Sequence, residues 1–118
     1  MTFAFWPKVD IAKSALDALK MALKMVTKGE PYEGIVLDLW LKPFNGFEVV
    51  RVLRELSEYR STPVVFLTKI GESSGQAGIA KELGGVIVPK GGYTAGQLLK
   101  AILAGLVQSA EMRGLLVL

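Results

Sequence analysis

The sequence predicts an α/β fold built around a parallel β-sheet. Short apolar segments rich in Val and Ile alternate along the chain with segments whose apolar residues recur at helical spacing. The apolar segments are continuous, which is typical of strands covered on both faces. Gly, Pro and Asn stand between the segments, where turns are expected. The length of 118 residues suits one domain, so we expect a single domain over residues 1–118.

The first two expected elements are an edge strand and a helix. The segment 8–12 (KVDIA) alternates polar and apolar residues, as does a strand near a sheet edge. Ser14 and Asp17 have the spacing of a helix N-terminal capping box. Apolar residues then recur at helical spacing, at Leu16, Leu19, Leu23 and Val26. Lys28 and Gly29 end this helix.

The central part of the chain predicts two covered strands and two helices. Residues 35–39 form the first covered strand, and Pro43, Asn45 and Gly46 mark the loop after it. The elements that follow are a helix over 47–56, a strand over 63–67, a polar loop over 71–75 and a helix over 76–83.

Two further elements close the expected fold. Residues 86–88 form a third covered strand, followed by Pro89 and Lys90. Thr94 caps a last helix, whose apolar face is formed by Leu98, Leu99, Ile102, Leu103 and Leu106.

The composition excludes several classes of function. The chain has no Cys and no His, so a Ser-His-Asp triad, a Cys-His pair and an ordinary zinc site are excluded. Any metal must be a hard ion bound by oxygen atoms. The net charge is +3 and the basic residues are spread along the chain, so we expect no direct contact with nucleic acid. No apolar run has the length of a membrane span, and we expect a cytoplasmic protein without membrane contact.

Three residues with reactive side chains stand at the ends of the covered strands. They are Asp38, Thr68 and Lys90. The carboxyl ends of parallel strands meet at one edge of the sheet, where binding sites form. A carboxylate, a hydroxyl and an ammonium group at one edge can accept a phosphoryl group on the carboxylate. The alternative is structural: a turn-forming acid, a strand-terminal hydroxyl and a solvated lysine.

These segments resemble the receiver domain of response regulators. DLWLKPFNGFEVVRVLREL is similar to the central signature of that family, in which the phosphoacceptor Asp precedes a loop and an amphipathic helix. PVVFLTK resembles the family's fourth strand, and ELGGVIVPKGGYTAGQLLKAI its fifth strand and last helix. VDIAKSALDALKMAL resembles its second strand and helix. The resemblance implies a flavodoxin-like (CheY-like) three-layer αβα sandwich.

The resemblance also implies a function. The chain would be the receiver domain of a two-component phosphorelay response regulator, and its partner would be a sensor histidine kinase. Asp38 would be the phosphoacceptor, Thr68 the switch hydroxyl and Lys90 the phosphate partner. The Asp38 carboxylate and the backbone carbonyl of Trp40 would be ligands of Mg²⁺. No general base or cofactor motif is visible, so we do not expect an independent enzyme.

The sequence departs from the family at its beginning. The family's first strand, which ends in the acidic pair that holds magnesium, does not precede residues 8–12. Asp10 is the only nearby acid and lies within the expected edge strand, so we expect Mg²⁺ binding to be weak or absent. The first strand is therefore expected to be missing or replaced by the C-terminal segment 113–118. Leu115–Leu118 would take the place of the first strand in the middle of the sheet, either within the chain or by exchange in a homodimer.

Two alternatives to phosphoacceptance remain open at this point. One is a degenerate pseudo-receiver that acts as a protein-interaction or dimerisation module without phosphorylation. The other is a rearranged scaffold of the same fold with no retained activity. The absent acidic pair favours these alternatives, whereas Asp38, Thr68 and Lys90 favour phosphorylation.

Overall fold

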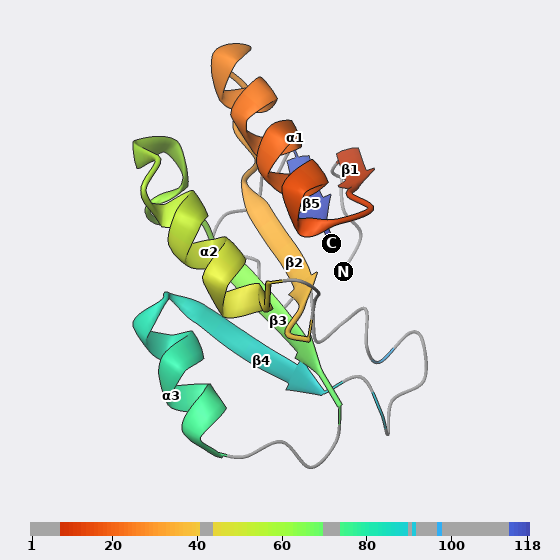
Figure 1. Ribbon diagram of the computed structural model, residues 1–118, viewed down its shortest axis with the longest axis vertical. Helices are drawn as coiled ribbons and strands as arrows, with labels where there is room; N and C mark the ends of the chain where they lie inside the picture. The colour runs from red at the N-terminus through yellow and green to blue at the C-terminus, as the bar shows by residue number, and fades with distance from the viewer. Residues whose placement is uncertain (1–7, 41–43, 70–73, 90, 92–96, 98–113) are drawn as a thin grey trace.

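The computed structural model describes residues 8–40, 44–69, 74–89, 91, 97 and 114–118. Its regular elements alternate between strand and helix up to residue 89 (Figure 1). The strands are β1 (Lys8–Ile11), β2 (Gly34–Asp38), β3 (Val64–Thr68), β4 (Gly85–Pro89) and β5 (Gly114–Val117). The helices are α1 (Ala15–Thr27), α2 (Gly46–Arg54), α3 (Ser74–Glu82) and the 3₁₀ turn η1 (Ser57–Tyr59). The predicted α/β fold is thereby confirmed.

The described strands form one five-stranded sheet in the order β1-β5-β2-β3-β4, and every pairing is parallel. The prediction of a missing first strand is wrong, because β1 is an N-terminal strand and the sheet is continuous. Its alternative, replacement by the C-terminal segment, is confirmed, because β5 pairs with β1 on one side and β2 on the other. The pairing is made within one chain; an exchange between two chains stays a prediction.

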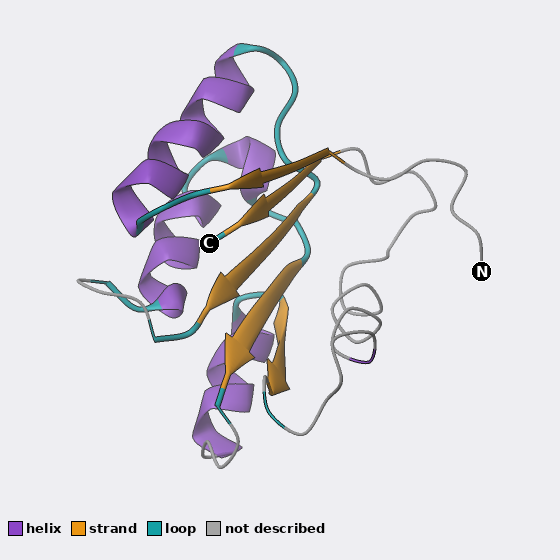
Figure 2. Cartoon of the chain, turned by 90° about the vertical axis from the view of Figure 1, so that its right-hand side faces the viewer, coloured by secondary structure: helices purple, strands orange, loops and turns teal. Residues whose placement is uncertain are grey.

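The sheet has one face packed against helices and a second, smaller apolar face. Helices α1, α2 and α3 all lie on the first face (Figure 2). The main core forms there around Phe66, whose ring meets the ring of Phe47 edge to face at a centroid distance of 4.9 Å. Successive side chains of a strand point to opposite faces of the sheet. The strand residues that point away from the helices, such as Val36, Val65 and Leu115, form the second cluster. The last helix expected from the sequence, capped by Thr94, lies outside the described residues except for Gln97.

Local sequence signals explain where the helices begin and end. In α1 the Ser14 hydroxyl accepts the Asp17 N–H, as predicted, and the Asp17 carboxylate accepts the N–H of Lys13. Helix α1 ends before Gly29, whose φ of 74° is a left-handed conformation that glycine adopts without strain. Helix α2 begins with a second capping box, formed by Asn45 and Glu48; the sequence predicts Asn45 only as a loop residue and Glu48 as part of the helix.

The buried face of α1 is formed by alanines and not by its leucines. Ala15, Ala18 and Ala22 are almost fully buried against the sheet, whereas Leu16 and Leu23 are exposed. Both sets recur at helical spacing, so periodicity alone did not distinguish them. The small side chains let α1 lie close to the strands, while Leu19 and Val26 pack against the core at partial burial and only Leu16 and Leu23 among its leucines are exposed.

Candidate functional site at the carboxyl edge of the sheet

Asp38 is the last residue of β2, and both neighbouring strands hold its backbone. Its N–H donates to the carbonyl oxygen of Leu118 at 3.0 Å on one side, and its register partner on β3 is Leu67. The residues of β2 before it are buried, while Asp38 itself is half-buried. The carboxylate thus stands at the carboxyl edge of a strand with a neighbour on each side, which is where binding sites form in open parallel sheets.

Hydrogen bonds hold the described residues that flank positions 41–43 close to this edge. The Trp40 N–H donates to Asp38 Oδ1 at 3.2 Å, an interaction typical of an Asx turn, so the carboxylate has the structural role of the alternative interpretation as well. The Gly46 N–H donates to the Leu39 carbonyl at 2.8 Å. A Cβ on Gly46 would lie 2.9 Å from the Asp38 carbonyl oxygen. Glycine therefore lets the start of α2 approach the backbone of Asp38.

Thr68 is the last residue of β3 and is 2% exposed. Within the described part of the chain, its buried hydroxyl oxygen has no hydrogen-bond partner. Burying a hydroxyl in this way costs about 1–3 kcal/mol, so the group can gain by bonding to a ligand. An unpartnered buried hydroxyl beside a candidate phosphoacceptor is consistent with the predicted role of Thr68.

The strand register gives the relative positions of the predicted site residues Asp38, Thr68 and Lys90 at this edge. Asp38 pairs with Leu67, so Thr68 lies one residue further along the adjacent strand. Thr68 in turn pairs with Pro89, the residue before Lys90. Lys90 lies outside the described residues, and its role stays a prediction. Because successive side chains alternate between faces, those of Asp38 and Thr68 leave the sheet on opposite faces, and a shared ligand must lie beyond the strand ends.

Two aromatic side chains border the candidate site and were not assigned to it from the sequence. Trp40 is 54% exposed and Phe44 is 47% exposed, on either side of residues 41–43. Large aromatic residues are enriched in protein interfaces. Their position in a loop rich in Pro, Asn and Gly directly after a strand-terminal acid is the signal that could have identified them.

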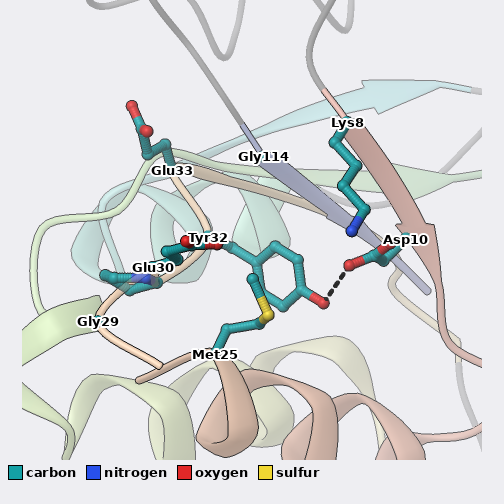
Figure 3. A pocket seen from close by; sticks show the side chains of 9 residues that line it. Lys8, Asp10, Met25, Gly29, Glu30, Tyr32, Glu33 and Gly114 are labelled. Carbon is teal, nitrogen blue, oxygen red and sulfur yellow. Dashed lines mark hydrogen bonds between the residues drawn. The ribbon is translucent and has the colours of Figure 1, made fainter. Parts of the chain in front are cut away.

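The described residues do not form a complete magnesium site. Among them, no group of three or more acidic residues could hold a metal ion. Asp10 accepts the Tyr32 hydroxyl at 2.7 Å in a hollow of about 540 Å³, bounded also by Met25 and by Glu30, which follows the end of α1 (Figure 3). Asp38 and the carbonyl of Trp40 stay the predicted ligands of a metal ion.

Electrostatics at the Asp10 hollow favour a neutral tyrosine. Burial raises the pKa of Tyr32 strongly, and the hydrogen bond and negative charge of Asp10 raise it further. The Tyr32 N–H donates to the Tyr59 hydroxyl at 3.4 Å, which itself donates to the Ala22 carbonyl at 2.7 Å. Burial is likewise the main cause that raises the pKa of Tyr59. These bonds tie α1, η1 and β1 together, which is a structural role.

Comparisons with known proteins identify the fold. No family model and no curated protein matches the sequence. Chemotaxis protein CheY4 of Vibrio cholerae is similar in structure, with a TM-score of 0.58, 19% identity, and coverage of 88% of this chain and 100% of CheY4. A putative response regulator from Chloroflexus aurantiacus has a TM-score of 0.59 and 15% identity, covering 86% of this chain and 98% of that protein.

A metal-bound structure is also similar in fold. The Mn²⁺-bound form of response regulator Rcp1 has a TM-score of 0.51 and 19% identity, and the match covers 83% of this chain and 91% of Rcp1. None of the described helices is long and apolar enough to cross a membrane. At low sequence identity, this chain has the fold of the CheY-like receiver domains of response regulators.

Proposed function

We propose that the chain is a phosphoacceptor receiver domain of a two-component phosphorelay, modified on Asp38 by a sensor histidine kinase. The observation that carries the proposal is the position of Asp38 at the carboxyl edge of β2, one register position from Thr68 on β3, whose buried hydroxyl has no partner among the described residues. The receiver fold supports it. Lys90 follows Pro89, the register partner of Thr68, and would reach the same edge.

The proposed chemistry is a transfer between two side chains. One Asp38 carboxylate oxygen attacks the phosphorus of a phosphohistidine on the kinase. The P–N bond breaks, its electron pair stays on the imidazole nitrogen, which takes up a proton, and an acyl phosphate forms on Asp38. Thr68 would donate a hydrogen bond to one phosphoryl oxygen, and the Lys90 ammonium would neutralise part of the charge. The chain thus accepts the group and needs no catalytic histidine of its own.

The family resemblance implies a divalent metal ion beside Asp38. The structure shows which oxygen atoms could bind it. Rcp1 holds Mn²⁺ in its crystal structure. Here the predicted oxygen ligands are the Asp38 carboxylate and the Trp40 carbonyl, and Asp10 is engaged elsewhere by Tyr32. A divalent ion would neutralise charge during the transfer. With this donor set we expect any Mg²⁺ to bind weakly, and we route no step through it.

Incubation with acetyl phosphate and magnesium, followed by intact mass spectrometry, tests the proposal. We expect a gain of one phosphoryl group that hydroxylamine removes, as it does an acyl phosphate. Asp38→Asn should abolish the gain. Asp10→Asn is the matched control, because Asp10 lies in the hollow beside Tyr32 and should leave the gain unchanged. Modification that survives in Asp38→Asn would contradict the assignment.

The second candidate function is a pseudo-receiver that binds other proteins without phosphorylation. The incomplete acidic set among the described residues favours it, as do the exposed aromatic rings of Trp40 and Phe44 beside the site. Failure of Asp38 to gain a phosphoryl group, even at high magnesium and with intact folding by circular dichroism, would select this function. A homodimer through exchanged terminal segments belongs to the same alternative, and sedimentation of the full chain tests it.

A further inference from the structure

Helix α1 presents large apolar side chains to solvent. Leu16 is 61% exposed and Leu23 is 51% exposed, although both belong to a well-formed helix. The contact of α1 with the sheet uses its alanine face, so the domain does not need these leucines for its core. All three helices lie on one side of the sheet (Figure 2). Leu16 and Leu23 remain exposed beside this packed layer.

The exposed residues have the spacing of a helix-pairing seam. Leu16 and Leu23 stand one heptad apart, and Leu19 and Val26 complete the alternating spacing of three and four residues that pairs helices. Leu19 and Val26 are partly buried and pack against the core, so they form the floor of the seam. A continuous apolar stripe of this kind differs from scattered exposed residues, which need no explanation.

The charges beside the stripe define the partner. Lys20 and Lys24 are exposed on α1, four residues apart and so on one side of the helix, and Lys13 is exposed just before its N-cap, Ser14. The one acid on this helix, Asp17, accepts the N–H of Lys13 at the helix N-terminus. A second copy would bring lysines against lysines, whereas acidic flanks would complement them.

We propose that this surface, defined as Leu16, Leu19, Leu23, Lys20 and Lys24 of α1 with Lys13 just before the helix, binds an amphipathic helix with acidic flanks from a partner protein. The apolar residues of the partner would cover the leucines, and its Glu or Asp side chains would lie beside the lysines. A single helix covers less area than the standard interface, so we infer a weak, rapidly exchanging contact. The contact is independent of Asp38, which lies on a strand.

The probe is a synthetic helical peptide with Leu at the a and d positions of three heptads and Glu at every e and g position. Repulsion between its Glu residues disfavours self-pairing of the peptide. We expect saturable binding to the full chain by fluorescence anisotropy. The double variant Leu16→Ser/Leu23→Ser should weaken binding at least about tenfold. Lys20→Glu/Lys24→Glu should weaken it several-fold and reduce its salt dependence.

Matched controls make the test specific to this surface. Val52→Ser changes a residue of similar exposure, 53%, on helix α2 and should leave binding unchanged. Asp38→Asn should also bind normally, so a failed phosphorylation assay and a failed binding assay remain distinguishable. The charge variant keeps the leucines and tests the proposal even if the serine variant is poorly folded by circular dichroism.

Three results would overturn the proposal. One is the absence of saturable peptide binding, or binding that survives both double variants. A second is a Leu16- and Leu23-dependent dimer in sedimentation, which would assign the surface to a second copy. The third is Leu-dependent binding to vesicles of phosphatidylserine and phosphatidylcholine that exceeds binding to the peptide, which would assign it to an anionic membrane.

Discussion

The two edges of the sheet differ in whether their buried polar groups have hydrogen-bond partners. At the amino edge, the Tyr32 N–H, the Tyr59 hydroxyl and the Ala22 carbonyl form a bonded series, and the Tyr32 hydroxyl is bonded to Asp10. At the carboxyl edge, the Thr68 hydroxyl is buried without a partner among the described residues. The hydrogen bonds at the amino edge stabilise the fold, whereas the Thr68 hydroxyl at the carboxyl edge can still form a hydrogen bond with a ligand.

The largest expected effect is the loss of the Tyr59 hydroxyl. Tyr59→Phe removes the acceptor of the Tyr32 N–H and the donor to the Ala22 carbonyl, both of which are buried. We expect a loss of about 2–4 kcal/mol in the free energy of unfolding, because two polar groups lose their partner. Urea denaturation measures it. A loss below about 0.5 kcal/mol would show that water or another group replaces the hydroxyl.

The next effect is at the carboxyl edge, where the start of α2 approaches the backbone of Asp38 closely. Gly46→Ala places a Cβ 2.9 Å from the Asp38 carbonyl oxygen, so the start of α2 must shift. We expect a cost of about 1–3 kcal/mol and slower phosphorylation of Asp38 by acetyl phosphate. Gly78→Ala in α3, where an added Cβ meets nothing within 4 Å, is the control and should not destabilise the protein. Equal effects of both substitutions would contradict the close-approach argument.

A smaller effect is expected from alkaline titration at the amino edge. The folded state raises the pKa of Tyr32, so its neutral form contributes stability that is complete below the unfolded tyrosine pKa of about 10. This contribution is lost as the pH rises above that value. Thermal unfolding between pH 8.5 and about 10.5 measures the decline. Tyr32→Phe should flatten it, and an unchanged slope in this variant would assign the decline to other groups, such as Tyr59.

The smallest effect on stability is predicted for a substitution of Thr68. It tests whether the two edges differ as described. Thr68→Val removes a buried hydroxyl that has no described partner, so we expect a change in unfolding free energy of only about 0–1 kcal/mol, neutral or stabilising. The same substitution should reduce phosphoryl-group gain on Asp38. A stability loss as large as that of Tyr59→Phe would mean that Thr68 has a structural partner, and the two edges would then be alike.

Much of the fold could be predicted because its signals are local. The continuous apolar runs identified β2, β3 and β4, and Ser14 with Asp17 identified the start of α1. The position of β5 depends on pairings between residues far apart in sequence, so no local pattern gives it. It was predicted because the family's first strand was not found at the beginning of the sequence and the C-terminal residues resemble that strand.

The site was predictable at the level of residue type but not of contact. Asp38 and Thr68 were identified because acids and hydroxyls at strand ends stand out against apolar runs. The bond between Tyr32 and Asp10 joins residues 22 positions apart, and periodicity carries no information about it. The buried face of α1 was also beyond pattern reasoning, because Ala18 and Leu19 both recur with the helical period.

The place of β5 in the sheet has a consequence for how the chain folds. It is the last of the five strands in chain order, yet it joins β1 to β2 in the interior of the sheet. Until residues 114–117 emerge from the ribosome, β1 has no strand to pair with and one edge of β2 is open. Closure of the long connection between Lys8 and Gly114 raises the contact order and slows folding. The pairing of β1 therefore waits for the last described strand of the chain, whereas β2, β3 and β4 pair with one another without it.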